Sequence, residues 1–113
     1  MGPSYKDISS SGTLNNDMPF SLLDSEGQQR YLCINKDNIT VLDGKGRMKH
    51  FYRFETIIRW GATDTGFGLV CQKRRMLSGV TVKKYSFRTE EGEKISDRLM
   101  GRIHELMDER GLR

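Results

Sequence analysis

Few residues in this chain of 113 amino acids have side chains suited to catalysis or metal binding. His50 falls in a strand-like run and His104 in a helix-like run, and neither has a cysteine, serine or carboxylate at a catalytic or metal-ligand spacing. Cys33 and Cys71 lie in separate strand-like runs without metal-ligand spacing, so we expect reduced core residues of an intracellular protein. The sequence therefore predicts a protein that is not an enzyme and holds no metal or cofactor.

A candidate binding segment lies in residues 56–71, TIIRWGATDTGFGLVC. Its ends are rich in β-branched, aromatic and aliphatic residues and its middle is small and polar, a pattern that predicts an antiparallel hairpin. Arg59 beside Trp60, followed by a glycine that leaves the backbone bare, suits a strand edge that meets an extended peptide. The alternative is an ordinary core tryptophan. Because strand side chains alternate, the first arm has two expected faces: Ile57, Arg59 and Gly61 on one, Ile58, Trp60 and Ala62 on the other.

The formal net charge of +4 is unevenly distributed. Lys73, Arg74 and Arg75 form one of the basic clusters, which makes them candidates for a rim that attracts anionic phospholipid headgroups. Nucleic-acid binding usually calls for a denser basic stripe with interleaved aromatic residues or a known motif. The sequence has neither, so we expect no nucleic-acid partner.

The elements that position these residues occupy one small domain. Residues 1–17 are polar and of low complexity, so we expect a flexible linker there and a single domain over residues 18–113. No run approaches the roughly 18 apolar residues of a membrane span, and residues 1–17 contain no apolar signal-peptide core. Turn signals separate seven predicted strands, at residues 20–23, 30–35, 38–42, 49–54, 56–62, 67–73 and 80–88.

The hydrophobic period then changes from two to that of a helix, predicted over residues 90–110. Apolar residues recur every three or four positions at Ile95, Leu99, Ile103 and Leu106. We expect Thr89 to be the N-cap, and the glutamates that follow it complement the positive end of the helix dipole, which explains them without an acid–base role. The predicted fold is mainly β, a bent seven-stranded sheet or open barrel of the pleckstrin-homology (PH) type, capped by this helix.

The order of the elements and three of the segments, TIIRWGA, GFGLVC and YSFRTEEGEKISDRLMGRIHELM, resemble the third, phosphotyrosine-binding-like (PTB-like) lobe of FERM domains, particularly that of talins. The resemblance covers most of the chain from about Phe20 to Arg110. It is most specific at Arg59-Trp60 and at residues 89–93. Residues 72–79 are more basic than the talin pattern, and similar lobes occur in the tails of certain myosins and kinesins, so the parent protein stays open.

This resemblance implies a non-catalytic module that recognises an NPxY-like peptide in the cytoplasmic tail of a membrane receptor, or a cytoskeletal protein, and so links membrane and cytoskeleton. The peptide would add a strand to a sheet edge beside the C-terminal helix. A location in the cytoplasm, at the cytoskeleton or at the inner face of the plasma membrane follows from this. The implied peptide contacts are Ile57, Ile58, Arg59, Trp60 and Gly61.

Two alternatives remain open. The first is the binding of anionic phospholipids such as phosphoinositides through the basic rim of Lys73, Arg74 and Arg75. The usual PH lipid pocket surrounds the first strand turn, which here is the acidic segment 24–27, so only the rim is a candidate. The second is a purely structural lobe that packs against the other lobes of a larger FERM protein.

Overall fold

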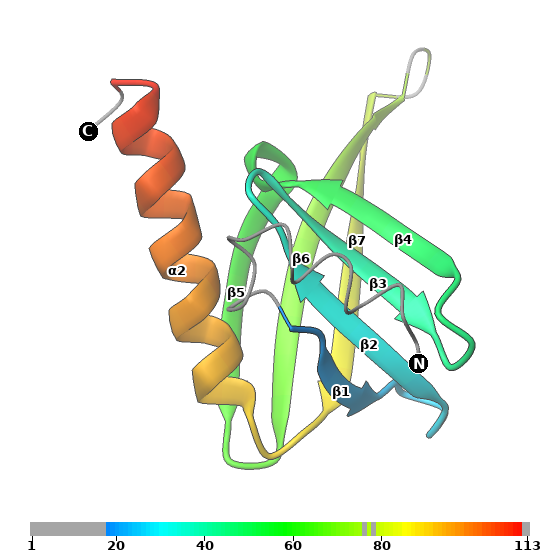
Figure 1. Ribbon diagram of the computed structural model, residues 1–113. Helices are drawn as coiled ribbons and strands as arrows, with labels where there is room; N and C mark the ends of the chain where they lie inside the picture. Colours follow the sequence, from blue (N-terminus) through cyan, green and yellow to red (C-terminus); the bar gives the residue numbers. More distant parts are fainter. Residues whose placement is uncertain (1–17, 76, 78, 112–113) are drawn as a thin grey trace.

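The computed structural model describes residues 18–75, 77 and 79–111, with only the backbone described for Arg75. The predicted linker lies outside this part. The predicted order of seven strands and one C-terminal helix is confirmed, with bounds shifted by no more than two residues (Figure 1). Among the described residues, no helix is long and apolar enough to cross a membrane. The elements are β1 (Phe20–Leu23), β2 (Gln29–Ile34), β3 (Asn38–Asp43), β4 (Met48–Arg53), the short 3-10 helix η2 (Phe54–Thr56), β5 (Ile57–Thr63), β6 (Gly66–Arg75), β7 (Gly79–Arg88) and α2 (Gly92–Glu109).

The strands form one bent antiparallel sheet in the order β4-β3-β2-β1-β7-β6-β5. Short turns join most neighbouring strands, and β1 pairs with β7 through Leu23 and Arg88, which connects the two halves of the sheet. The sheet does not close, because β4 and β5 end it on either side. Each of these two strands therefore has one edge without a partner strand in the described part of the chain.

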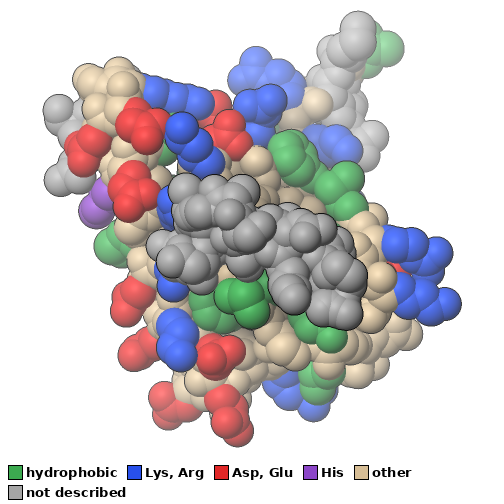
Figure 2. All heavy atoms as spheres, in the orientation of Figure 1, with side chains coloured by type: hydrophobic (Ala, Val, Ile, Leu, Met, Phe, Trp, Pro, Cys, Tyr) green, Lys and Arg blue, Asp and Glu red, His purple; other side chains and the backbone are tan. Residues whose placement is uncertain are grey.

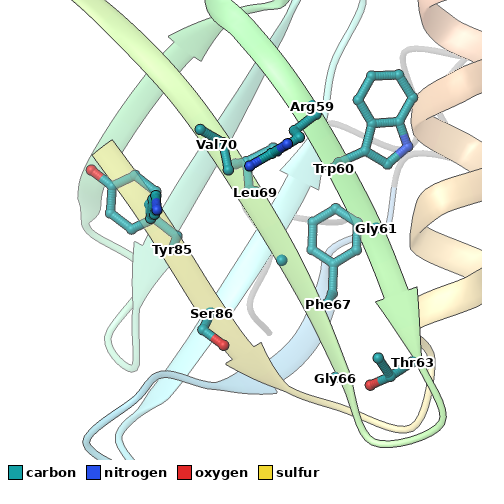
Figure 3. Close-up of a pocket in the computed structure, with 12 residues that line it drawn as sticks. Arg59, Trp60, Gly61, Thr63, Gly66, Phe67, Leu69, Val70, Tyr85 and Ser86 are labelled. Atoms are coloured by element: carbon teal, nitrogen blue, oxygen red, sulfur yellow. The ribbon is translucent and has the colours of Figure 1, made fainter. Parts of the chain in front are cut away.

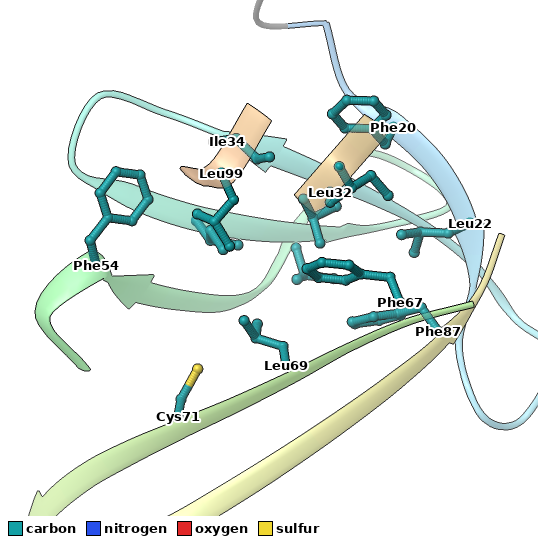
Figure 4. Packing of buried hydrophobic residues seen from close by; sticks show 13 residues of the cluster. Phe20, Leu22, Leu32, Ile34, Phe54, Phe67, Leu69, Cys71, Phe87 and Leu99 are labelled. Atoms are coloured by element: carbon teal, nitrogen blue, oxygen red, sulfur yellow. The ribbon is translucent and has the colours of Figure 1, made fainter. Parts of the chain in front are cut away.

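The hydrophobic core lies inside the bend and under α2 (Figure 4). Alternate residues of the strands point inward, as the period of two requires, so Leu32 and Ile34 of β2 meet Leu69 and Cys71 of β6 in one apolar cluster. Leu99 of α2 completes this cluster and is fully buried. The apolar stripe predicted for the helix is thus confirmed, with Ile95 also fully buried and Ile103 and Leu106 partly buried against the core.

The start of α2 differs from the prediction. The backbone N–H of Thr89 donates a hydrogen bond to the carbonyl oxygen of Thr65 (3.0 Å), which holds Thr89 against the β5–β6 turn. The helix consequently begins later, with Glu91 at the N-cap position. The Thr89 hydroxyl still accepts a hydrogen bond from the N–H of Glu91 (3.0 Å), so it stabilises the turn that precedes the helix and is not the helix N-cap.

Gly92 lets the first turn of α2 pack directly on the β5–β6 hairpin. A methyl group at this position would collide with the carbonyl oxygen of Gly66 and lie 3.2 Å from the Cβ of Ala62. The glycine is therefore required by close approach, because no side chain fits between the helix and the hairpin.

Candidate functional site

The candidate peptide edge is the free side of β5, which pairs with β6 on its other side and has α2 as its neighbour in space (Figure 1). The five residues suggested by the sequence all lie in this strand. Their pairing with β6 is interrupted by a register shift between Ile57 and Arg59. This bulge puts an extra residue into β5. The edge is thus formed by the predicted segment but has an irregular start.

The bulge makes the predicted faces of β5 wrong at Ile57 and Ile58. Ile57 was expected beside Arg59 and Gly61, but it packs against the core, as Trp60 and Ala62 do. Strict alternation fails here because two successive residues of the bulged strand oppose one residue of β6. Ile58 is consequently 49% exposed, next to the exposed Arg59.

Trp60 connects β5 to the helix. Its side chain points toward α2 (Figure 3), and its indole Nε1 donates a hydrogen bond to the Ser96 hydroxyl oxygen at 3.1 Å. The ring is half-buried and packs against the core cluster. Trp60 therefore has the packing role considered as the alternative and also forms part of the surface between strand and helix. Ser96 was not singled out from the sequence, since a lone serine on a helix carries no specific signal.

A pocket of about 220 Å³ lies between η2 and the C-terminal half of α2. The helix contacts the β5–β6 hairpin at its N-terminal end and diverges from β5 toward its C-terminal end (Figure 1), where this pocket lies. Across the rim, Arg110 Nη1 lies 3.4 Å from Glu55 Oε2. We call this space the wedge pocket; its lining residues are Phe54, Glu55, Ile103, Leu106, Met107 and Arg110.

Sequence reasoning missed the wedge pocket because Phe54 and Leu106 come from elements far apart in the chain. The available signals were Met107 beside the apolar stripe of the helix and an apolar residue at the end of the fourth predicted strand. Neither signal indicates a cavity, since the pocket depends on the angle between η2 and α2.

The outer face of the β5–β6–β7 sheet carries a second hollow, of about 430 Å³ (Figure 3). Gly61, Gly68 and Ser86 pair across the three strands, and the hollow lies over them because glycine and serine have no or only small side chains. Arg59 lies over β6 beside Val70 and borders this hollow, so its guanidinium group is on the outer side of the sheet and not in the wedge pocket.

The basic residues predicted as a lipid-binding rim lie elsewhere. Lys73 and Arg74 are exposed near the end of β6, in a part of that strand that β5 does not reach, and the Arg75 backbone pairs with Gly79. Lys73 and Arg74 border a third hollow, of about 360 Å³, together with residues of β4. The structure thus separates the predicted rim from the predicted peptide edge.

His50, Tyr52 and Tyr85 form a half-buried aromatic cluster. The His50 ring lies 4.8 Å from the Tyr85 ring between centroids, and the hydroxyl groups of Tyr52 and Tyr85 share a hydrogen bond. Burial, and then the nearby Lys49, lowers the pKa of His50 below its ordinary value, and burial also raises the pKa of Tyr52. Among residues 18–75, 77 and 79–111, no three metal-binding side chains come together.

Cys33 and Cys71 are not joined by a disulfide bond. Cys71 is fully buried, and burial raises the pKa of its thiol to about 11, so it stays protonated at neutral pH. Cys33 is partly buried. His104 is exposed on α2.

Comparison with solved structures identifies the fold. The MyTH4-FERM MF2 domain of myosin VII from Dictyostelium discoideum (mutant 1) matches 77% of this chain with a TM-score of 0.57 and 24% identity. The Drosophila Merlin complex of FERM and C-terminal domains matches 84% with a TM-score of 0.66 and 17% identity. This chain covers 17% and 32% of those two chains, respectively. At these identities the likeness concerns the fold, and it agrees with the resemblance to a FERM lobe.

Comparison at the level of sequence gives the family. No curated protein matches the chain. The family model described as "PTB domain (IRS-1 type)" matches residues 23–107. This range includes β2 to β7 and nearly all of α2, whereas most of β1 precedes it. The chain belongs to the family of IRS-1-type PTB domains.

Proposed function

We propose that this domain is a binding module that captures an extended peptide by strand addition at the free edge of β5. The single observation that carries this proposal is that β5 ends the sheet beside α2. An end strand presents unpaired backbone N–H and C=O groups, which an extended peptide can satisfy without any particular sequence. Affinity then comes from the backbone, and selectivity from the side chains on both sides of the new strand.

The two sides of such a peptide would meet different surfaces. Side chains that face α2 would contact Trp60 and the wedge pocket, where Phe54, Leu106 and Met107 offer an apolar surface for one large apolar residue. Side chains that face outward would pass Ile58 and Arg59, which are exposed. Arg59 supplies a planar cation that can hydrogen-bond a carbonyl or carboxylate of the peptide.

The proposed ligand is an NPxY-like segment in the cytoplasmic tail of a membrane receptor or in a cytoskeletal protein. Strand addition requires an extended run before the turn that such a motif favours, because asparagine followed by proline initiates turns. The wedge pocket lies beyond the start of β5 and provides space for a chain that leaves the strand there. This function would place the protein in the cytoplasm, at the cytoskeleton or inner face of the plasma membrane.

Calorimetric titration with an NPxY-containing peptide tests the proposal. Arg59→Ala should weaken binding by about tenfold or more, because hydrogen bonds to a charged group contribute about 1.5–3 kcal/mol. Met107→Ala should weaken it by removing apolar contact area from the wedge pocket. Lys45→Ala, an exposed cation in the β3–β4 turn, is the control and should leave the affinity unchanged. Unchanged affinity in both site variants would refute the proposed contacts.

A second candidate function is that of a packing lobe within a larger FERM protein. It is favoured by the comparison with solved structures, since this chain covers only 17% of the myosin VII chain and 32% of the Merlin chain. The same titration separates the two functions. A lobe that serves only for packing should fail to bind the peptide, whereas the module proposed above should bind it with the domain alone.

A further inference from the structure

The sheet has a second free edge, on β4. β4 ends the strand order opposite β5, and within the described residues no strand pairs with its other edge. A bulge disturbs its pairing near Met48, but residues 50–53 pair regularly with β3. A regular unpaired edge is a ready site for another strand. The peptide proposed above uses β5, so the edge of β4 needs an explanation of its own.

The pairing with β3 shows which amides of β4 are free. The N–H of Phe54, just after β4, donates a hydrogen bond to the carbonyl oxygen of Asp37 (3.0 Å), so these two residues form a hydrogen-bonded pair. Hydrogen-bonded and non-hydrogen-bonded pairs alternate along an antiparallel ladder. The N–H of Tyr52 therefore faces β3, whereas the N–H groups of Phe51 and Arg53 point to the free edge.

The two faces of β4 differ in character. His50 and Tyr52 face the interior, where their rings contact Tyr85 of β7. Phe51, between them in the sequence, points to the opposite face and is 46% exposed. A peptide added to this edge would therefore have one row of side chains beside an exposed aromatic ring and the other row on the side of β6 and β7.

Between β4 and β6, the same edge borders a basic hollow of about 360 Å³. Lys49 and Arg53 of β4 line this hollow together with Lys73 and Arg74 of β6, and no carboxylate lines it. Among the described residues, none of these four side chains takes part in an ion pair. Figure 2 shows basic side chains on this side of the molecule, whereas acidic ones are concentrated along α2. The uncompensated charge favours an anionic group in the hollow.

We propose that the free edge of β4 captures a second extended segment, a peptide of a protein partner in which acidic and apolar residues alternate. Its backbone would pair with the amides of Phe51 and Arg53. Its acidic side chains would enter the basic hollow, and its apolar side chains would cover Phe51. Alternation supplies both kinds of contact at once, because strand side chains have a period of two. A nucleic acid supplies the charge but cannot continue the sheet.

The geometry calls for a short segment. Regular pairing covers residues 50–53, which at about 3.3 Å per residue is about 13 Å of strand. A probe of eight residues spans this edge and extends beyond it on both sides. Because β4 and β5 lie at opposite ends of the strand order, a peptide on β5 leaves the edge of β4 accessible.

Calorimetric titration of the whole chain with three synthetic peptides of eight residues tests the charge pattern. In the probe, glutamate alternates with valine, and it should bind at low salt. A peptide of four glutamates followed by four valines should bind at least about fivefold more weakly, since only half of its glutamates would face the hollow. A peptide in which lysine alternates with valine should not bind. No binding of the probe, or equal binding of the two acidic peptides, would overturn the proposal.

Proline at position 53 isolates the contribution of the backbone. Arg53 has φ −73° and ψ 150°, which proline adopts without strain, and its N–H faces away from β3. Arg53→Ala removes only the cation, whereas Arg53→Pro also removes the N–H donor. The proline variant should bind the probe about two- to tenfold more weakly than the alanine variant, the effect of one backbone hydrogen bond. Equal affinity of the two variants, both folded by thermal unfolding, would exclude strand addition.

A matched pair of double variants tests the hollow. Lys73→Ser with Arg74→Ser should weaken binding of the probe about tenfold, since each exposed ion pair contributes up to about fivefold. Lys84→Ser with Arg88→Ser removes the same charge from exposed positions of β7 outside the hollow and should change the affinity by less than about threefold. An equal loss in both double variants would mean attraction by net charge alone and would contradict the proposed site.

Amide hydrogen exchange locates the bound probe in the wild-type chain. Phe51 and Arg53 should gain protection, whereas Tyr52, whose N–H already faces β3, should change little. Protection within Ile57–Thr63 and none in β4 would show that the probe uses the edge of β5, and the second site would then be refuted.

Discussion

The same substitution at two positions of α2 should have opposite effects on stability. Gly92 and Gly101 are both helical glycines, and neither has a positive φ, so alanine is conformationally allowed at each. At Gly101 a new Cβ meets nothing within 4 Å. We expect Gly101→Ala to stabilise the domain by about 0.5–1 kcal/mol, because alanine loses less backbone entropy in a helix.

At Gly92 the new methyl group would collide with the backbone carbonyl of Gly66, which cannot rotate away as a side chain can. Overpacking of this kind costs about 1–3 kcal/mol. The collision can be relieved only if the start of α2 moves from the β5–β6 hairpin, and this would lengthen the hydrogen bond between Trp60 and Ser96 four residues later. We therefore expect Gly92→Ala to destabilise the fold and to change the environment of Trp60.

Urea unfolding followed by tryptophan fluorescence measures both effects, since Trp60 is the only tryptophan. The two variants should differ by about 1.5–4 kcal/mol in the free energy of unfolding, with the wild type between them. If Gly92→Ala proves as stable as Gly101→Ala, with unchanged native fluorescence, the close packing of α2 on the hairpin is wrong.

Two further predictions concern the core and its pH dependence. Leu99→Ala should lower the free energy of unfolding by about 2–5 kcal/mol because Leu99 is fully buried, whereas Met100→Ala, at a side chain that is 46% exposed, should change it by less than about 0.5 kcal/mol. Equal costs in urea unfolding would mean that α2 does not cover the core through Leu99. His50 has a folded pKa below its ordinary value of 6.5, so the folded state binds fewer protons than the unfolded state, and stability should be full above pH 6.5 and lost as pH falls through the folded pKa. His50→Gln should remove this loss, and an unchanged pH profile of thermal unfolding in that variant would contradict the assignment.

The elements and their order could be predicted because each has a strong local signal. The period-two pattern of Ile39 and Val41 identifies a strand, and the recurrence of Ile95 and Leu99 identifies a helix with one buried face. A bent open sheet leaves one side of its apolar interior uncovered, and a helix with one apolar stripe can cover that side. The fold could therefore be predicted from these two patterns. The resemblance to a FERM lobe selected the strand that lies beside the helix.

Features that depend on pairing geometry could not be predicted. The bulge after Ile57 has no sequence signal, so its effect on the faces of β5 appears only in the register with β6. The wedge pocket depends on the angle at which α2 leaves the hairpin. The last pair of the β6–β7 hairpin was also missed, because the strands were predicted to end at Lys73 and to begin at Val80, whereas cross-strand pairing continues to Arg75 and Gly79.

Amide hydrogen exchange of the isotopically labelled domain, with and without an NPxY-containing peptide, tests strand addition at β5 most directly. In Ile57–Thr63, alternate amides point to the free edge and should gain protection when the peptide binds, whereas the intervening amides, already paired with β6, should change little. Chemical shifts should move around Trp60 and in the wedge pocket. A peptide that binds but leaves β5 and the facing residues of α2 unchanged would contradict the account.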